Sequence, residues 1–199
     1  MRKDFEIDLD YCISCIKSGQ IFLYPTDTVW GIGADATNEA AAQRIMELKR
    51  RPAKKSFVIL VANLQQLSRY VRHFDTAILP YLTNIKKPTT VIYPGAIGLA
   101  PTVMAQDGTV AIRICEDPFC QSLLLQSDKP LLSTSANLSG APTPGIYKEI
   151  HPAIIQGVDY VVKYRQEDTR YREPSTIIKY EPSGHRSVQG QSPIKIIRP

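Results

Sequence analysis

Short β-branched segments alternate with amphipathic segments along the whole chain, and this alternation is the feature that most constrains the fold. Strands are predicted at residues 20–24, 56–62, 89–93, 108–114, 130–134, 158–162, 175–180 and 194–197. Helices are predicted at 8–18, 38–50, 63–71, 118–126 and 145–156, with further helical sequence up to residue 85. Interleaved strands and helices indicate an α/β protein, and consecutive strands without an intervening helix indicate a twisted sheet of mixed pairing.

The length of 199 residues fits a single domain, with a core at about 8–180 and a C-terminal tail and last strand at 181–199. No apolar run approaches the roughly 20 residues that a membrane span requires. Acidic residues stand near the N-terminus, where a secretory signal has its apolar segment. We therefore expect a cytoplasmic protein that does not associate with membranes.

Four cysteines are present, and Cys12 and Cys15 form a C-x-x-C pair. This pair falls in a predicted amphipathic helix, where a spacing of three residues places both side chains on one face. Zinc knuckles usually occur on glycine-rich or polar turns, which are missing around this pair. The pattern favours buried thiols over a zinc site, and we expect no protein-bound metal.

Positive charge is concentrated in one short run. The net charge is +5, from 24 basic and 19 acidic residues. Five of the basic residues are Lys49, Arg50, Arg51, Lys54 and Lys55. Cations at the end of a helix offset its dipole, which accounts for one or two of them. Five together indicate a polyanionic ligand, either phosphate groups or nucleic acid.

Two polar segments follow predicted strands. Residues 24–33, YPTDTVWGIG, combine the hydroxyls of Thr26 and Thr28 with Asp27 and two glycines, which allow a ligand close to the backbone. A plain turn capped by a hydroxyl explains this segment equally well. Residues 132–140, LSTSANLSG, place five neutral polar side chains after a strand, more than the single one that a helix cap needs.

Arg113 is an arginine inside an otherwise apolar strand, on the same face as Thr109. A bare buried charge is expensive, so such an arginine is usually paired or functional. Arg113 is a candidate for binding a substrate carboxylate, and an internal salt bridge is an equally good explanation. The three histidines lie away from these segments, and no nucleophile motif or Walker motif is present. The pattern therefore indicates a site that binds and orients polyanions.

Five motifs, in this order, resemble the YrdC/TsaC family of threonylcarbamoyl-AMP synthases. They are YPTDTVWGIG, LKRRPAKK, TVAIR, STSANLSG and PSTI, the last at residues 174–177. The resemblance covers about residues 8–199, and five motifs in sequence are highly specific. It implies a YrdC-like fold, a twisted mixed sheet flanked by helices with a large, concave, basic groove.

The resemblance also implies a nucleotidyltransferase that makes threonylcarbamoyl-adenylate from L-threonine, bicarbonate and ATP, for threonylcarbamoyladenosine in tRNA. The catalytic residues it implies are Lys49 and Arg51. Threonine contacts fall on Thr26, Thr28, Arg113, Ser133 and Ser175, and ATP contacts on Lys49, Arg51, Lys55, Thr109, Ser135, Asn137, Thr143 and Arg198. Mg²⁺ is expected to arrive with ATP. The expected partners are the downstream tRNA threonylcarbamoyl-transfer proteins, and tRNA itself is a further candidate.

Three positions depart from the family pattern. Trp30 replaces a tyrosine that many members have. Leu60 stands where some members place a histidine that contacts threonine. Residues 86–90, KKPTT, replace the common WPGPLT segment, which forms one wall of the groove.

Two other functions fit parts of the sequence. A non-catalytic module that binds tRNA or double-stranded RNA is compatible with the isoelectric point of about 9.0. RNA-binding surfaces, however, usually spread their cations over a wide face with aromatic residues. A carbamoyl-transfer enzyme using carbamoyl phosphate is the third candidate, but such domains usually belong to much larger chains.

Overall fold

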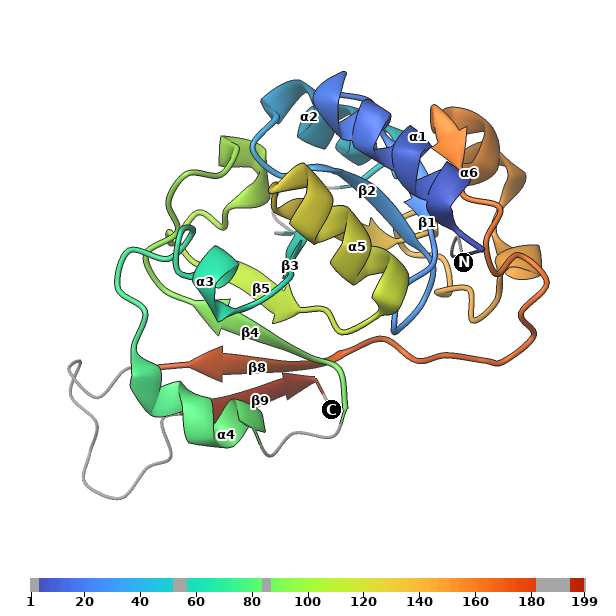
Figure 1. Cartoon of the computed structure of the whole chain (residues 1–199). Coiled ribbons are helices and arrows are strands. Elements are labelled where there is room, and N and C mark those ends of the chain that lie inside the picture. Colours follow the sequence, from blue (N-terminus) through green and yellow to red (C-terminus); the bar gives the residue numbers. More distant parts are fainter. Residues whose placement is uncertain (1–3, 52–56, 84–86, 182–193, 199) are drawn as a thin grey trace.

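The computed structural model describes residues 4–51, 57–83, 87–181 and 194–198, which form a mixed sheet with helices packed on it (Figure 1). The sheet has nine strands in the order β7-β1-β2-β6-β3-β5-β4-β8-β9. Their bounds are β1 (Phe22–Tyr24), β2 (Gly31–Asp35), β3 (Val58–Val61), β4 (Thr89–Tyr93), β5 (Val110–Ile114), β6 (Leu131–Ser135), β7 (Tyr160–Val161), β8 (Thr176–Tyr180) and β9 (Ile194–Arg198).

The helices are mostly short. The α-helices are α1 (Glu6–Lys17), α2 (Glu39–Leu48), α3 (Leu64–Leu67), α4 (Leu79–Thr83), α5 (Pro118–Ser127) and α6 (Pro152–Gly157). Single 3₁₀ turns are η1 (Thr76–Ile78), η2 (Pro101–Val103) and η3 (Tyr147–Glu149). Among the described residues, no helix has the length and apolar character needed to span a membrane.

The predicted mixed pairing is confirmed. β1 pairs with β7, β3 with β5 and β4 with β8 in parallel, whereas the other neighbouring strands run antiparallel. The predicted strand at 89–93 coincides with β4, and the other predicted strands agree with the observed ones to within about two residues at most ends.

β2 is a strand that the sequence analysis missed, because its glycines indicated a ligand-binding loop. It pairs antiparallel with β1 and aligns Gly33 with Phe22 and Gly31 with Tyr24. A Cβ on Gly33 would lie 2.7 Å from a ring carbon of Tyr24 and 3.0 Å from one of Phe22. The glycines therefore leave room for two aromatic rings of the neighbouring strand, and β2 carries the sheet from β1 to β6.

Two predicted helices are shorter than expected. The helix predicted at 63–71 ends after one turn as α3, which is capped by the Asn63 side chain. The helix predicted at 145–156 is wrong as a single element, because only η3 and α6 form within it. Pro152 has no N–H and begins α6 at its first position, where His151 acts as the N-cap. Residues 145–146, which precede η3, are not helical.

The helices cover one face of the sheet and leave the other face for a cavity. In Figure 1, α1, α2 and α5 lie in front of the strands. Ile112 and Ile114 of β5 line a hollow on this helical side together with Leu67 of α3. Because neighbouring residues along a strand face opposite sides, Arg113 points away from the helices. The polar residues of β5 and β6 thus gather on the open face.

A buried carboxylate fixes α1 to the segment that follows β7. Asp8 accepts hydrogen bonds from the Tyr160 hydroxyl (2.6 Å) and from the backbone N–H groups of Lys163 (3.0 Å) and Tyr164 (2.9 Å). Asp8 is buried, so these three hydrogen bonds replace the water that its carboxylate loses on folding. The position of residues 163–165 therefore depends on a side chain from the first helix.

We expect Asp8→Ala to lower the free energy of unfolding by about 3 kcal/mol, since three hydrogen bonds to a charged group are lost together. Asp10→Ala, at an exposed position of the same helix, is the matched control and should change stability by about 0.5 kcal/mol or less. Urea denaturation of the three proteins measures both effects. Equal midpoints for the two variants would contradict the anchoring role of Asp8.

Candidate functional site

A cavity of about 220 Å³ lies on the open face of the sheet. Strands that are far apart in the sequence contribute to it, because the sheet places β2, β6, β3 and β5 side by side and brings β8 and β9 next to them across β4. The structure brings nine of the predicted site residues together around this cavity: Thr26, Thr28, Arg51, Arg113, Ser133, Ser135, Thr143, Ser175 and Arg198.

The turn after β1 presents two threonine hydroxyls to the cavity. The Thr26 hydroxyl donates to the Val29 carbonyl (2.8 Å) and accepts from the Thr28 N–H (2.9 Å). Since the single hydroxyl proton of Thr26 is used in this way, Thr28 is the donor in the 2.9 Å contact between the two hydroxyls. The plain turn considered above is thus present, and its hydrogen bonds orient the hydroxyl of Thr28.

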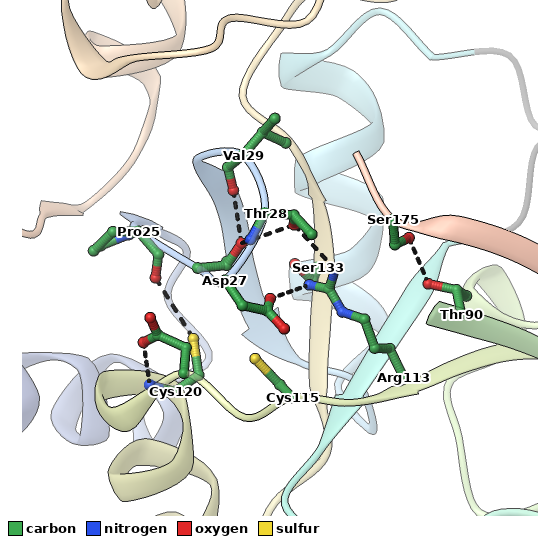
Figure 2. Close-up of polar contacts among 12 residues, drawn as sticks. Pro25, Asp27, Thr28, Val29, Thr90, Arg113, Cys115, Cys120, Ser133 and Ser175 are labelled. Atoms are coloured by element: carbon green, nitrogen blue, oxygen red, sulfur yellow. Dashed lines mark hydrogen bonds and ion pairs between the residues drawn. The ribbon is translucent and has the colours of Figure 1, made fainter. Parts of the chain in front are cut away.

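Arg113 is the central cation of the site, and only 4% of the residue is exposed. Its Nη1 donates to the Thr28 hydroxyl (3.0 Å), and its Nη2 lies 3.1 Å from Asp27 Oδ1 (Figure 2). The internal salt bridge is therefore present. The Nε of Arg113 nevertheless has no hydrogen-bond partner within the described part of the chain. A carboxylate is the ligand that such a buried, incompletely paired guanidinium binds best.

Serine hydroxyls flank Arg113 on two sides. Tyr24 donates its hydroxyl to Ser133 Oγ at 2.7 Å, and Ser175 Oγ lies 2.8 Å from the Thr90 hydroxyl. Figure 2 shows Ser133 close to the guanidinium of Arg113, and the pair of Ser175 and Thr90 to the right of it. Burial raises the pKa of Tyr24 well above its usual value, so Tyr24 remains a donor and Ser133 keeps its own proton for a ligand.

Arg198 connects the last strand to the cavity. Its Nη2 and Nε donate to the Ser175 carbonyl at 2.8 and 3.2 Å. Burial and the charge of Arg113 lower the pKa of Arg198, yet an arginine remains protonated. Two guanidinium groups therefore face the cavity from β5 and β9.

Arg51 provides the third cation of the cavity. Its guanidinium lies 4.7 Å from the ring centre of Phe57, and its Nη1 is 3.5 Å from the Thr134 hydroxyl. The arginine follows the end of α2, so the helix and the aromatic ring hold the charge beside the Ser133–Ser135 end of β6.

Lys49, expected to contact phosphates, does not line the cavity. Only 1% of it is exposed, and its Nζ donates to the carbonyls of Ser135 (2.5 Å) and Asn137 (2.5 Å). Asn137, expected at the nucleotide, also lies outside the cavity wall. Its Oδ1 accepts from the Ser135 hydroxyl (2.6 Å), and its Nδ2 donates to the Ala141 carbonyl (2.7 Å). Both side chains hold the loop after β6 in shape.

Two predicted site residues remain, Thr109 and Lys55. Thr109 stands before β5, and its hydroxyl donates to Asp107 Oδ1 (2.7 Å), so it does not line the cavity. Lys54, Lys55 and Lys86 lie outside the described residues. Leu60 pairs with Arg113 across β3 and β5 and is fully buried, which places an apolar side chain beside the cation.

The cysteines and the acidic residues do not form a metal site in the described ranges. All four cysteines are free and buried, as predicted. Cys120 Sγ donates to the Pro25 carbonyl (3.5 Å), directly below the threonine turn (Figure 2). No group of three or more histidine, cysteine or acidic side chains comes together there.

The roles of Asp27, of Trp30 and of a group of three arginines were not predicted from the sequence. Asp27 was noticed as a carboxylate of the turn, but its pairing with Arg113 was not predicted. Trp30 lines the cavity and packs against Tyr147 at 5.0 Å between ring centres. Arg165, Arg170 and Arg172 line a second hollow beside Thr26 and Thr28. Three arginines within eight residues were the available signal for this last group.

Comparisons with known proteins show the family and the fold. The family model Sua5/YciO/YrdC, described as "Telomere recombination", matches residues 14–198. A threonylcarbamoyl-AMP synthase of Stenotrophomonas maltophilia is 32% identical over 160 residues, which cover 79% of this chain and 86% of the relative.

Two solved structures share the fold. Escherichia coli YciO superposes with a TM-score of 0.78 at 22% identity, covering 96% of this chain and 88% of its own. Pyrococcus abyssi Sua5, solved with L-threonine, gives a TM-score of 0.80 at 23% identity. The match covers 92% of this chain but spans only about half of Sua5, 54%.

The burial of Lys49 has a measurable consequence. Burial, and then the charge of Arg51, lowers the pKa of Lys49 to about 7. The unfolded chain has the usual lysine pKa, so between pH 7 and about 10 it binds a proton that the native protein has released. Stability due to Lys49 therefore increases with pH in this range.

We expect the free energy of unfolding of the wild type, relative to that of Lys49→Met, to increase from pH 7 to pH 9.5. Methionine keeps the length of the side chain but removes the titrating group. Urea denaturation at several pH values provides the measurement. A difference that does not change with pH would show that Lys49 stays charged in the fold, held so by its carbonyl partners.

Proposed function

The chain belongs to the Sua5/YciO/YrdC family, and from this membership and the geometry of the cavity we infer that it is a threonylcarbamoyl-AMP synthase. The observation that carries the inference is Arg113, a buried cation with an unpaired N–H beside two oriented hydroxyls. The cavity continues from Arg113 to Arg51, so it has room for an amino acid at one end and phosphates at the other.

Threonine is proposed to bind at the Arg113 end. The carboxylate pairs with the Arg113 guanidinium, whose Nε gains the acceptor it lacks. Ser133 is proposed to donate to the same carboxylate, since its hydroxyl proton is free where Tyr24 donates to it. Thr28, whose proton goes to Thr26, acts by orienting the guanidinium. A solved Sua5 structure contains L-threonine, which supports an amino-acid site in this fold.

ATP is proposed to bind along the wall formed by Arg51, Ser135, Thr143 and Arg198. The phosphates lie at Arg51, where the guanidinium stabilises the charge that develops during pyrophosphate departure. ATP is proposed to enter as its Mg²⁺ complex, because Mg²⁺ is usually bound largely through substrate phosphates and water. Lys49 and Asn137 act through the loop that they hold and are positioning residues.

The reaction has two connected steps. The threonine amine combines with bicarbonate, giving a carbamate and water. A carbamate oxygen then bonds to the α-phosphorus of ATP while the bond to the β-phosphate oxygen breaks, so that threonylcarbamoyl-adenylate and pyrophosphate form. Holding the reactants together on one wall raises their effective concentration, and the cavity protects the short-lived carbamate from water. The product passes to proteins that modify tRNA.

Pyrophosphate release tests the synthase directly. We expect the purified protein to release pyrophosphate from ATP only when threonine and bicarbonate are both present. The measurement is a coupled pyrophosphate assay with each substrate omitted in turn. No release under any combination, together with tight binding of tRNA, would favour the non-catalytic RNA-binding module instead.

Substitutions at the two ends of the cavity should affect different substrates. Arg113→Gln should raise the KM for threonine at least 30-fold, because removing one partner of a buried charge pair costs about 2–5 kcal/mol. Arg51→Gln should raise the KM for ATP and lower kcat, since its charge acts on the departing phosphates. Arg69→Gln is the matched control, because this exposed arginine pairs with Asp128 away from the cavity. Equal effects of both variants on both KM values would contradict the assignment.

A further inference from the structure

A cavity of about 260 Å³ lies on the helical face of the sheet, opposite the face that carries the substrate cavity. Its floor is formed by Val91 of β4 and Ile112 of β5, which are register partners, with Ile114 beside them. Leu67 of α3 and Leu82 of α4 also line it. The cavity is slightly larger than the substrate cavity of about 220 Å³, so it has room for a molecule of the size of an amino acid.

Charged side chains stand at one end of this apolar cavity. β4 and β5 run antiparallel, so the start of β4 and the end of β5 meet at the same end of the pair. Lys87 precedes β4, Glu116 follows β5, and both line the cavity. Both side chains are exposed, and neither forms an ion pair with another residue that the structure describes. A ligand at this end therefore meets an acidic and a basic group whose charges are not yet paired.

Asp27 adds a second carboxylate from the turn after β1. It lines this cavity and is not among the described residues that line the substrate cavity. Its Oδ1 lies 3.1 Å from Nη2 of Arg113, yet this buried oxygen accepts no hydrogen bond within the described ranges. Figure 2 shows no contact to the other oxygen. A carboxylate can accept about four hydrogen bonds, so Asp27 has unused capacity for a ligand or water.

The opposite end of the cavity carries a buried hydroxyl. Tyr93 of β4 lines the cavity and is the register partner of Val110, so it lies two residues from Val91 and away from the charged end. Only 2% of Tyr93 is exposed, and burial raises the pKa of its hydroxyl well above the usual value. The hydroxyl has no hydrogen-bond partner in the part of the chain that the structure describes. Buried polar groups usually have one, which again indicates a ligand or water.

We propose that this cavity binds a free α-amino acid with an apolar side chain, at a site separate from the substrate cavity. The ammonium group pairs with Asp27 and Glu116, and the carboxylate pairs with Lys87. The side chain lies on the apolar floor and points toward Tyr93. A simple amine would leave Lys87 unpaired, and a simple acid would leave both carboxylates unpaired. The zwitterion therefore matches the charged end best.

Asp27 connects this site to the substrate cavity, because the same carboxylate pairs with Arg113. A bound ammonium group partly neutralises Asp27, so the positive charge of Arg113 acts more strongly on a ligand carboxylate. This step rests on the function proposed above, in which Arg113 binds the carboxylate of threonine. The amino acid in the second cavity should therefore tighten the binding of threonine, and threonine should tighten its binding by the same factor.

Isothermal titration calorimetry with L-phenylalanine as the probe tests the site. We expect saturable binding of one molecule, and this binding should persist when threonine is present at a saturating concentration. Phenethylamine lacks the carboxylate, and N-acetyl-L-phenylalanine lacks the ammonium group. Each of these two compounds should bind at least fivefold more weakly than phenylalanine.

Two single variants address the charged end. Glu116→Gln and Lys87→Met should each raise the Kd of phenylalanine at least fivefold, and Lys87→Met should also abolish the preference for phenylalanine over phenethylamine. Glu47→Gln changes an exposed glutamate of α2 that does not line the cavity, so it is the matched control and should titrate like the wild type. All three positions are exposed, so thermal unfolding of the variants should match that of the wild type.

The linkage through Asp27 needs a separate measurement. Trp30 is the single tryptophan of the chain and lines the substrate cavity, so its fluorescence reports threonine binding. Saturating phenylalanine should lower the threonine concentration at half-saturation at least twofold in the wild type. The same phenylalanine concentration should have little effect in the double variant Glu116→Gln/Lys87→Met.

Three results would overturn the proposal. They are the absence of saturable phenylalanine binding, equal binding by the wild type and the charge variants, and displacement of phenylalanine by threonine, which would place it in the substrate cavity. An unchanged threonine titration would overturn the placement of the ammonium group at Asp27. If the protein releases no pyrophosphate but phenylalanine binds as expected, the synthase function fails while the second site stands.

Discussion

The ion pair between Arg113 and Asp27 is the interaction on which the site depends. A guanidinium in the middle of a sheet loses its hydration, and this loss is tolerated only where nearby groups replace the water. Asp27 and the Thr28 hydroxyl do so from one side, so the turn after β1 must lie against β5. In the sheet, β2, β6 and β3 lie between β1 and β5. The turn after β1 therefore reaches Arg113 across the ends of these three strands.

The same requirement explains why so much of the turn is fixed by internal hydrogen bonds. Thr26 commits its proton to Val29, which forces Thr28 to donate to Thr26 and to accept from Arg113. Cys120 supports the turn from below through the Pro25 carbonyl. A site with its donors already oriented loses little conformational entropy when a ligand binds. The rigidity of the turn therefore serves substrate binding as well as folding.

Sequence patterns predicted the fold where the local signal and the final environment agree. β-Branched runs predicted the central strands, and the helix predicted at 38–50 is α2, capped by Asn38. β2 escaped because its glycines are explained only by the rings of Tyr24 and Phe22 on the neighbouring strand. Lys49 and Thr109 were predicted to contact ATP, yet neither lines the cavity. For Lys49 the reason is tertiary, since its amine donates to the Ser135 carbonyl, whereas Thr109 donates to Asp107, two residues before it.

Counting charges along the sequence identified the basic run at residues 49–55 and did not identify a second group of three arginines. Arg165, Arg170 and Arg172 are followed or separated by acidic residues, so a count along the chain cancels them. In the fold, however, Glu167 pairs with Lys148, and Asp168 alone is left to two arginines. The electrostatic field at a site depends on which carboxylates lie beside it, and these are set by the path of the chain after β7. Asp8 holds the start of that path from α1, at the N–H groups of Lys163 and Tyr164, and Asp117 holds Arg165 directly after it.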